Sequence, residues 1–225
     1  MLQHASVTAV VLFLVMMLSS LMPSVSVSAR PVSVYPGAPA TASSASDITL
    51  HQLEVAFAGN CQNKTVGEAM SCADALPYIN AAMNKYNLQT RGQRAAYIAT
   101  MAYEGAYLKY DHNLVTHSQG TRSILPASSL WLFVDANKDV QEHWPKYPKG
   151  VNNDTIVDVL IKNHLDFEPG AWWTVSGPGV CAQYSMQLSG TMESFVNWEQ
   201  GCINGGNTTV EARWAVYTTV FASIW

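Results

Sequence analysis

One carboxylate lies alone in a long apolar stretch of the sequence. Glu104 is the only acidic residue in positions 75–110. A carboxyl group among Met101, Tyr103 and Tyr107 would be partly desolvated, and desolvation favours its neutral, proton-donating form. A glycoside hydrolase needs such a general acid. The alternative is a solvent-facing Glu near a helix C-terminus, where the helix dipole would slightly disfavour it.

A second carboxylate, Asp111, follows seven residues later. Seven steps of ~100° return to nearly the same helix face, at a rise of ~10.5 Å that a bend near Gly105 would shorten. Glycosidases hold their two carboxyl groups ~5–9.5 Å apart, depending on stereochemistry. Asp111 is therefore our candidate for orienting a water molecule, and an Asx turn ending the helix is the equal alternative. Weaker candidates, expected on the solvated side of their helix, are Asp135, Asp139 and Glu142.

Helices must position these groups, and periodicity predicts them along most of the chain. Asp47 can cap a helix with Leu50, Leu53 and Phe57 inward. The pattern then predicts a helix over 73–86 and another that starts at the capping box Thr90-Arg91-Gly92-Gln93 and runs through Leu108. Further helices are expected over 127–142, 154–164, 168–175, 191–201 and 209–223, the last behind a capping box at Thr208-Thr209-Val210-Glu211.

Residues 110–125 break the helical period. They contain Asp111-His112-Asn113 and Ser118-Gln119-Gly120-Thr121, which are typical of turns and hairpins. We therefore expect a mainly α domain of about eight helices around a small hairpin or irregular lobe.

The N-terminal segment predicts export. Its first 29 residues contain no Asp, Glu, Lys or Arg, Val7–Leu21 is an apolar run of secretory length, and Val27-Ser28-Ala29 resembles a cleavage site. An uncleaved anchor is the alternative, although the run is short for a membrane span. Residues 30–46 are rich in Pro, Ala and Ser, which predicts a disordered lead-in or a short propeptide. We assign 1–29 to a signal peptide and 47–225 to one domain of an extracellular protein.

The four cysteines, Cys61, Cys72, Cys181 and Cys202, all follow that segment. An even count in an oxidising compartment favours disulfides over zinc or thiol catalysis, and three pairings are possible. We prefer Cys61–Cys72 and Cys181–Cys202, because each pair closes a short loop. Three glycosylation sequons, at Asn63, Asn153 and Asn207, fit an extracellular surface.

Composition excludes several functions. Only 12 Lys and Arg stand against 16 Asp and Glu, which argues against nucleic acid as a partner. The sequence has no GxSxG, HExxH, P-loop or dinucleotide-binding motif, and its histidines lack metal-ligand spacing. We expect no metal, no cofactor, no membrane association after signal removal, and a monomer.

Several segments together resemble fungal secreted lysozyme-like proteins, within the wider fold that includes plant-type chitinases and transglycosylases. They are Arg94–Glu104, Lys109–Asn113, Gln119–Arg122, Asp166–Trp173 with Cys181, the stretch Trp198–Cys202, and the final helix. The resemblance covers roughly residues 50–222 in order.

The resemblance implies a lysozyme-like fold, with Glu104 at the end of a core helix beside a sugar cleft. It implies that Gln119 and Thr121 line the glycan groove, and the aromatic side chains of Tyr103 and Tyr107 would pack on sugar rings. The expected activity is hydrolysis of a β-1,4-linked N-acetylated cell-wall polysaccharide, peptidoglycan first and chitin second. The alternative is a catalytically inactive secreted effector or glycan-binding protein on the same fold.

Overall fold

The computed structural model describes residues 47–203 and 208–224, and these form ten α-helices and one π-helical turn. Within them the only β pairing is three isolated bridges. The prediction of a mainly helical domain is confirmed, with more helices than the eight expected. The proposed signal peptide, the Pro/Ala/Ser lead-in and the sequon residue Asn207 lie outside the described residues.

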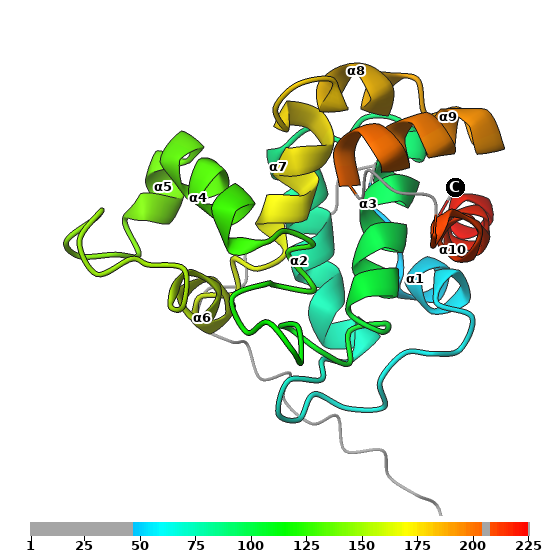
Figure 1. The fold of residues 1–225 in the computed structure, drawn as a ribbon. Coiled ribbons are helices and arrows are strands. Elements are labelled where there is room, and N and C mark those ends of the chain that lie inside the picture. The colour runs from blue at the N-terminus through cyan, green and yellow to red at the C-terminus, as the bar shows by residue number, and fades with distance from the viewer. Residues whose placement is uncertain (1–46, 204–207, 225) are drawn as a thin grey trace, which may run out of the picture. The chain divides into compact units, whose positions relative to one another are not determined.

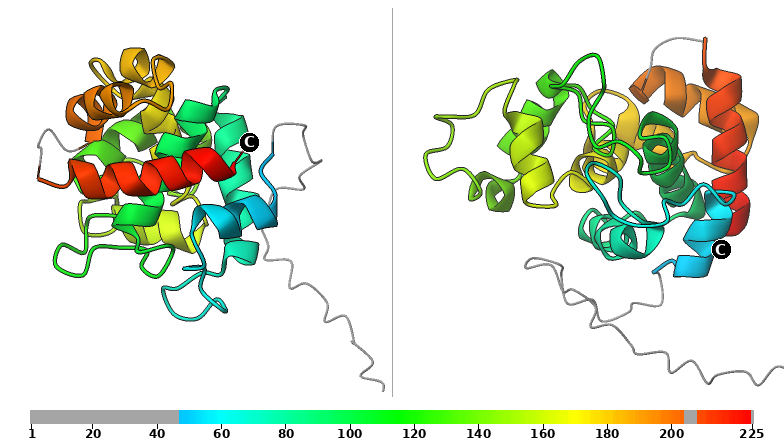
Figure 2. Two further views of the ribbon diagram at one scale, coloured as in Figure 1. Left: turned by 90° about the vertical axis from the view of Figure 1, so that its right-hand side faces the viewer. Right: turned by 90° about the horizontal axis from the view of Figure 1, so that it is seen from below.

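Helix α3 (Arg91–Glu104) is the central element, and it contacts α7 (Glu168–Ser176), α8 (Cys181–Met186) and α10 (Val210–Ser223). Every residue from Gly92 to Ala102 is buried, so the helix is covered on all sides rather than along one stripe. Its alanines allow neighbours to approach closely. Figure 1 shows α3 between α7 and α10, and Figure 2 shows α10 lying across it.

The N-terminal half of the described chain contributes two more helices, α1 (Leu50–Ala56) and α2 (Cys72–Lys85). Helix α1 contacts both α2 and the last helix, α10 (Val210–Ser223). The apolar spacing on this last helix predicts one buried stripe, of which Val210, Tyr217 and Ile224 are buried and Trp214 and Phe221 are partly buried. This stripe packs α10 against α1 and α3.

The remaining helices form two groups in the chain. The first contains α4 (Ala127–Ala136), α5 (Lys138–Gln141) and α6 (Ile156–Lys162), with α4 against α6 and α7. The second contains α7 (Glu168–Ser176), α8 (Cys181–Met186), α9 (Met192–Trp198) and the π turn η1 (Glu199–Ile203). The prediction of single helices over 127–142 and 191–201 was wrong, because each range divides into two elements. Helix α8 was not predicted.

Helix ends differ from the sequence predictions at three places. Thr49, not Asp47, caps α1, in a capping box with Gln52. The box predicted at Thr208 is absent, since Thr209 precedes α10 without a side-chain cap. The capping box of Thr90 with Gln93 is confirmed, but α3 ends at Glu104 instead of Leu108.

The chain after Glu104 turns in the opposite sense. Ala106, Tyr107 and Leu108 have φ angles of 47°, 57° and 69°. Each left-handed residue with a Cβ costs ~1–2 kcal/mol, so surrounding contacts must hold this turn. The loop continues to residue 125 with one antiparallel bridge, His112 to Gly120, and so forms the irregular lobe that was predicted as the alternative to a hairpin. The chain from Glu104 to Asp111 therefore contains the bend near Gly105 that the prediction from the sequence allowed for.

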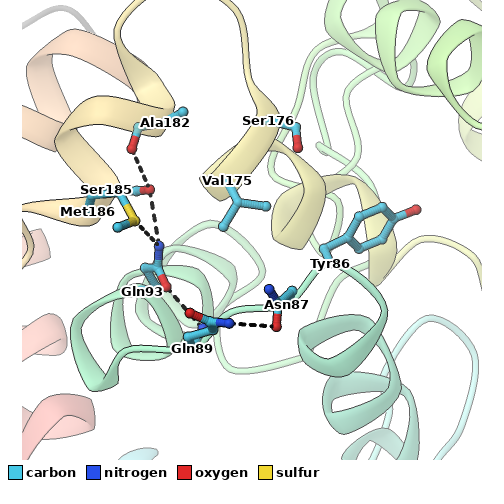
Figure 3. A pocket seen from close by; sticks show the side chains of 9 residues that line it. All are labelled: Tyr86, Asn87, Gln89, Gln93, Val175, Ser176, Ala182, Ser185 and Met186. Carbon is cyan, nitrogen blue, oxygen red and sulfur yellow. Dashed lines mark hydrogen bonds between the residues drawn. The ribbon is translucent and has the colours of Figure 1, made fainter.

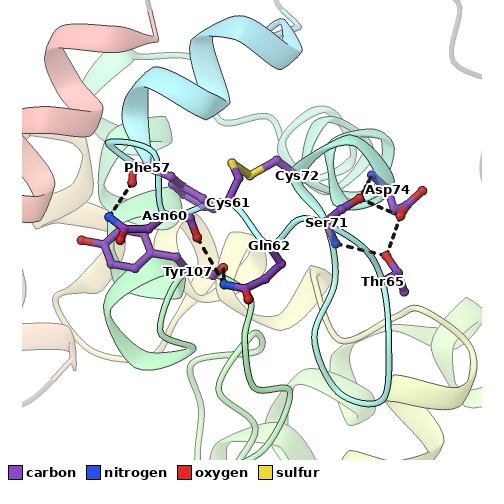
Figure 4. Close-up of a disulfide and its surroundings, with 9 residues drawn as sticks. All are labelled: Phe57, Asn60, Cys61, Gln62, Thr65, Ser71, Cys72, Asp74 and Tyr107. Atoms are coloured by element: carbon purple, nitrogen blue, oxygen red, sulfur yellow. Dashed lines mark hydrogen bonds between the residues drawn. A yellow bond between two sulfur atoms is a disulfide. The ribbon is translucent and has the colours of Figure 1, made fainter.

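Both predicted disulfide pairings are confirmed. Cys61–Cys72 joins the loop after α1 to the first residue of α2, with Cα atoms 5.5 Å apart. Figure 4 shows this bridge beside a polar cluster in which Asp74 accepts hydrogen bonds from Thr65 and Ser71, the N-cap of α2. Cys181–Cys202 joins α8 to η1, with Cα atoms 5.2 Å apart. The described helices include none that is both long and apolar enough to span a membrane.

Candidate functional site

The carboxylate of Glu104 lies where α3 meets α10. It is the last residue of α3, and 24% of its side chain is exposed. Arg213, in the first turns of α10, forms an ion pair with it. The predicted apolar surroundings are thus only part of the environment, because a guanidinium group faces the carboxylate directly.

Arg213 holds a second carboxylate as well. Its Nε lies 3.1 Å from Oε1 of Glu199, the first residue of η1. The guanidinium carbon lies 4.4 Å from the centre of the Tyr103 ring, and Nε donates a hydrogen bond to Thr209 Oγ1 at 3.0 Å. The result is a cluster of two carboxyl groups, one guanidinium and one aromatic ring, which we call the Glu104 cluster.

Glu199 is the most buried member of the Glu104 cluster, with no exposed surface. Burial raises its pKa to about 7 from an ordinary value of 4.5; Arg213 opposes the shift, and repulsion from Glu104 adds to it. Neither Glu199 oxygen makes a hydrogen bond to the described residues. The physical cause of the raised pKa is therefore the loss of hydration without hydrogen-bond donors to replace it.

Sequence reasoning missed Arg213 and Glu199, although a signal was present. Arg213 is the only Lys or Arg after Lys162, and it lies on the buried side of a helix beside Val210 and Tyr217. A lone Arg on an apolar helix face needs an acidic partner. The identity of that partner could not be read from the chain, because Glu104 is 109 residues away.

Asp111 lies in a different charge cluster. It is buried, its Oδ1 is 2.7 Å from His112 Nδ1, and its Oδ2 accepts a hydrogen bond from Arg122 Nη2 at 3.2 Å. Arg122 Nη1 also donates to Asp166 at 3.0 Å, and Nη2 donates to the Glu68 carbonyl. Arg122 thus fixes the 110–125 loop to the start of α7 and to the loop before α2.

Asp166 is fully enclosed beside Arg122. Burial raises its pKa to about 6 from 3.8, while Arg122 opposes the shift and Asp111 adds to it. Two carboxyl groups again share one guanidinium group. The two carboxylate oxygens of Asp111 contact His112 and Arg122, which leaves neither of them without a partner. The assignment of Asp111 as the water-orienting base stays a prediction.

The three side chains Glu68, Asp111 and His112 place ligand atoms within 4.8 Å of one another, which is close enough to hold a metal ion. However, Arg122 already donates to Asp111, and its positive charge would repel a cation there.

Of the predicted sugar-binding residues, Tyr103 lies in the Glu104 cluster and the others lie elsewhere. Tyr103 lies against Arg213, and Tyr107 packs edge-on against Phe57 and lines a small cavity of about 180 Å³ between α1 and α10. Thr121 donates to the Tyr110 carbonyl at 2.7 Å. A Cβ on Gly105 would lie 3.5 Å from Thr121 Oγ1, so the loop packs closely on the end of α3.

Two further predictions concern surface positions. Gln119 lies in the same loop and is partly buried, and its carbonyl accepts a hydrogen bond from Asn113 at 2.8 Å. The sequon residues Asn63 and Asn153 are exposed, as glycosylation would require. Asn153 Oδ1 accepts a hydrogen bond from Trp131 at 2.9 Å.

No protein-family model, no curated protein and no solved structure matches this chain.

Proposed function

We propose that the protein is a secreted glycoside hydrolase of the lysozyme-like fold that cleaves β-1,4-linked N-acetylated glycan, with Glu104 as general acid. The observation that supports this most directly is the Glu104 cluster, in which one guanidinium serves an exposed and a buried carboxyl group. Peptidoglycan is the first candidate substrate and chitin the second.

The chemistry follows from the shared guanidinium. Glu104 and Glu199 both face the guanidinium group of Arg213, so the charge of each carboxyl group acts on the other. Glu199 has no access to solvent, whereas Glu104 is partly exposed. Glu104 is therefore the member of the pair that a glycosidic oxygen can reach, which is the position a general acid needs.

Arg213 has a second role in this proposal. It lies against both carboxyl groups, so it orients Glu104 and stabilises the negative charge left on it after proton transfer. The ring of Tyr103 supports the guanidinium from one face. Asp111 remains the candidate for the second catalytic carboxylate, and the cleavage assay described below can also test this role.

The test is glycan cleavage by the purified secreted protein on peptidoglycan and chitin side by side. Glu104→Gln should lower the rate at least about 100-fold, since general acid catalysis contributes roughly 10²–10⁴. Glu211→Gln is the matched control, because Glu211 is exposed in the first turn of α10. Its rate should equal that of the wild type. Thermal unfolding of each variant checks that it folds.

A catalytically inactive effector or glycan-binding protein is the second candidate. The ion pair between Glu104 and Arg213 favours it, because a carboxylate held by a guanidinium is also a stable structural element. Absence of cleavage by the folded wild type on both glycans would exclude the hydrolase and support this candidate.

A further inference from the structure

A pocket of about 350 Å³ lies at the end of α3 opposite Glu104. Figure 3 shows it between the α2–α3 connection, the end of α7 and α8. None of its nine lining residues is Asp, Glu, Lys, Arg or His. Five of them carry an amide or an aliphatic hydroxyl group: Asn87, Gln89, Gln93, Ser176 and Ser185.

Gln93 is a fixed hydrogen-bond donor in this pocket. Only 3% of it is exposed, and its Oε1 accepts from the backbone N–H groups of Gln89 and Thr90, at 3.0 and 3.1 Å. These two bonds cap α3 and set the orientation of the amide group. The Nε2 atom, which carries two hydrogens, donates to Ser185 Oγ at 3.4 Å and to Met186 Sδ at 3.6 Å, and the first of these bonds is long for N–H···O (Figure 3).

Ser185 and Gln89 extend the polar wall in both directions. Ser185 is 1% exposed, and its hydroxyl donates to the Ala182 carbonyl at 3.1 Å. The Gln89 side chain donates to Asn87 Oδ1 at 3.2 Å, and both of these residues are exposed at the mouth of the pocket. The wall therefore offers donors and acceptors from its floor to its rim.

The other side of the pocket is apolar. Val175 and the ring of Tyr86 line it, whereas Met186 lies beside Ser185 on the polar side (Figure 3). The Tyr86 hydroxyl points away from the pocket and bonds to Glu168 at 2.9 Å and Asn137 at 3.1 Å, which fixes the ring (Figure 3). A ligand would find apolar surface on one side and amide and hydroxyl groups on the other.

We propose that this pocket binds an uncharged sugar unit. A pyranose has C–H faces that pack on apolar and aromatic surface and hydroxyl groups that bond to amides, and the pocket offers both. Its volume lies at the lower end of the range for small-molecule sites, which fits one or two sugar rings. The proposal is independent of the hydrolase, because Gln93 and Glu104 are about 16 Å apart along α3.

The experiment is a titration of the ¹⁵N-labelled Glu104→Gln protein with N-acetylglucosamine, followed by NMR. We expect saturable shifts of the Gln93 side-chain amide and of the Ala182 and Ser185 backbone amides. Glucosamine, whose amine is charged, should bind at least about tenfold more weakly, because no acidic residue lines the pocket to compensate it.

Two variants of α8 provide the matched control. Ala182→Phe places a ring inside the pocket and should weaken N-acetylglucosamine binding at least about tenfold. Gln183→Phe adds a similar ring at the next position, which is exposed and outside the pocket, and should bind as before. Equal binding by both variants, equal binding of glucosamine, or no shift at Gln93 in the folded protein would overturn the proposal. The titration does not depend on whether the wild type cleaves glycan.

Discussion

At the scale of single residues, the most unusual group is the buried carboxyl of Glu199. A carboxylate without hydrogen-bond donors is costly to bury, and one guanidinium shared with Glu104 does not replace its hydration. The raised pKa of Glu199 expresses this cost. A neutral side chain of the same shape should therefore fit the site without that cost.

Glu199→Gln should alter how stability depends on pH. Below about pH 4.5, Glu199 is neutral in both the folded and the unfolded state. Between pH 4.5 and about 7 the unfolded state releases the proton first, so wild-type stability falls as pH rises. We expect this loss to be on the order of 3 kcal/mol, and to be absent in the variant.

Urea unfolding at several pH values between 4 and 8 measures this difference. Asp166, whose pKa is raised to about 6, contributes a loss of the same sign and remains in the Glu199 variant. Asp166→Asn, alone and combined with Glu199→Gln, separates the two contributions. A Glu199→Gln variant whose stability falls with pH as steeply as that of the wild type would contradict the assignment.

At the scale of secondary-structure elements, the position of α3 depends on a close backbone approach. A Cβ built on Gly92 would lie 2.1 Å from the Leu188 carbonyl oxygen, in the chain between α8 and α9. Backbone atoms on both sides leave little freedom to adjust. Gly170 in α7 is different, because its nearest atoms, at 3.1 Å, belong to the side chain of Ile124.

Gly92→Ala should therefore lower the free energy of unfolding by about 3 kcal/mol or more, as overpacking against fixed atoms does. Gly170→Ala should cost much less, because Ile124 can shift and alanine favours the helix by roughly 1 kcal/mol. Chemical denaturation of the two variants compares them directly. Similar losses in both would show that the approach of α3 to Leu188 is not tight.

At the scale of the whole molecule, the two disulfides close separate loops. Cys181–Cys202 spans 21 residues and ends in η1, the turn that begins with Glu199. Cys61–Cys72 spans 11 residues, far along the chain from that turn. In addition, the Trp173 indole donates to the Cys202 carbonyl at 2.9 Å, so η1 is fixed from two sides.

Removing either bridge by a double Cys→Ala substitution should destabilise the protein by roughly 3 kcal/mol. The two double variants should differ in their rate of the proposed glycan cleavage. Loss of Cys181–Cys202 frees the turn that holds Glu199 and should reduce the rate, whereas loss of Cys61–Cys72 should leave it nearly unchanged. Cleavage and thermal unfolding are measured on the same samples. Equal rates for both double variants would mean that the bridge does not position the Glu104 cluster.

The sequence by itself determined the local features of this protein. Apolar periodicity located most helices, and the Thr90–Gln93 box located the start of α3. The short spacings of the cysteines predicted both disulfides. These features depend on residues close in the chain, so the side chains that specify them are visible in a short window. The predicted position of Glu104 near the end of a buried helix follows from the same pattern.

Only the tertiary structure decided which charges meet. Arg213 reaches Glu104 because α10 lies across α3, and Arg122 joins Asp111 to Asp166 because the 110–125 loop folds onto α7. The left-handed turn at 106–108 had no sequence signal, since Ala, Tyr and Leu rarely adopt it. An ion pair between distant residues depends on how helices pack, and no local preference of either residue records that packing.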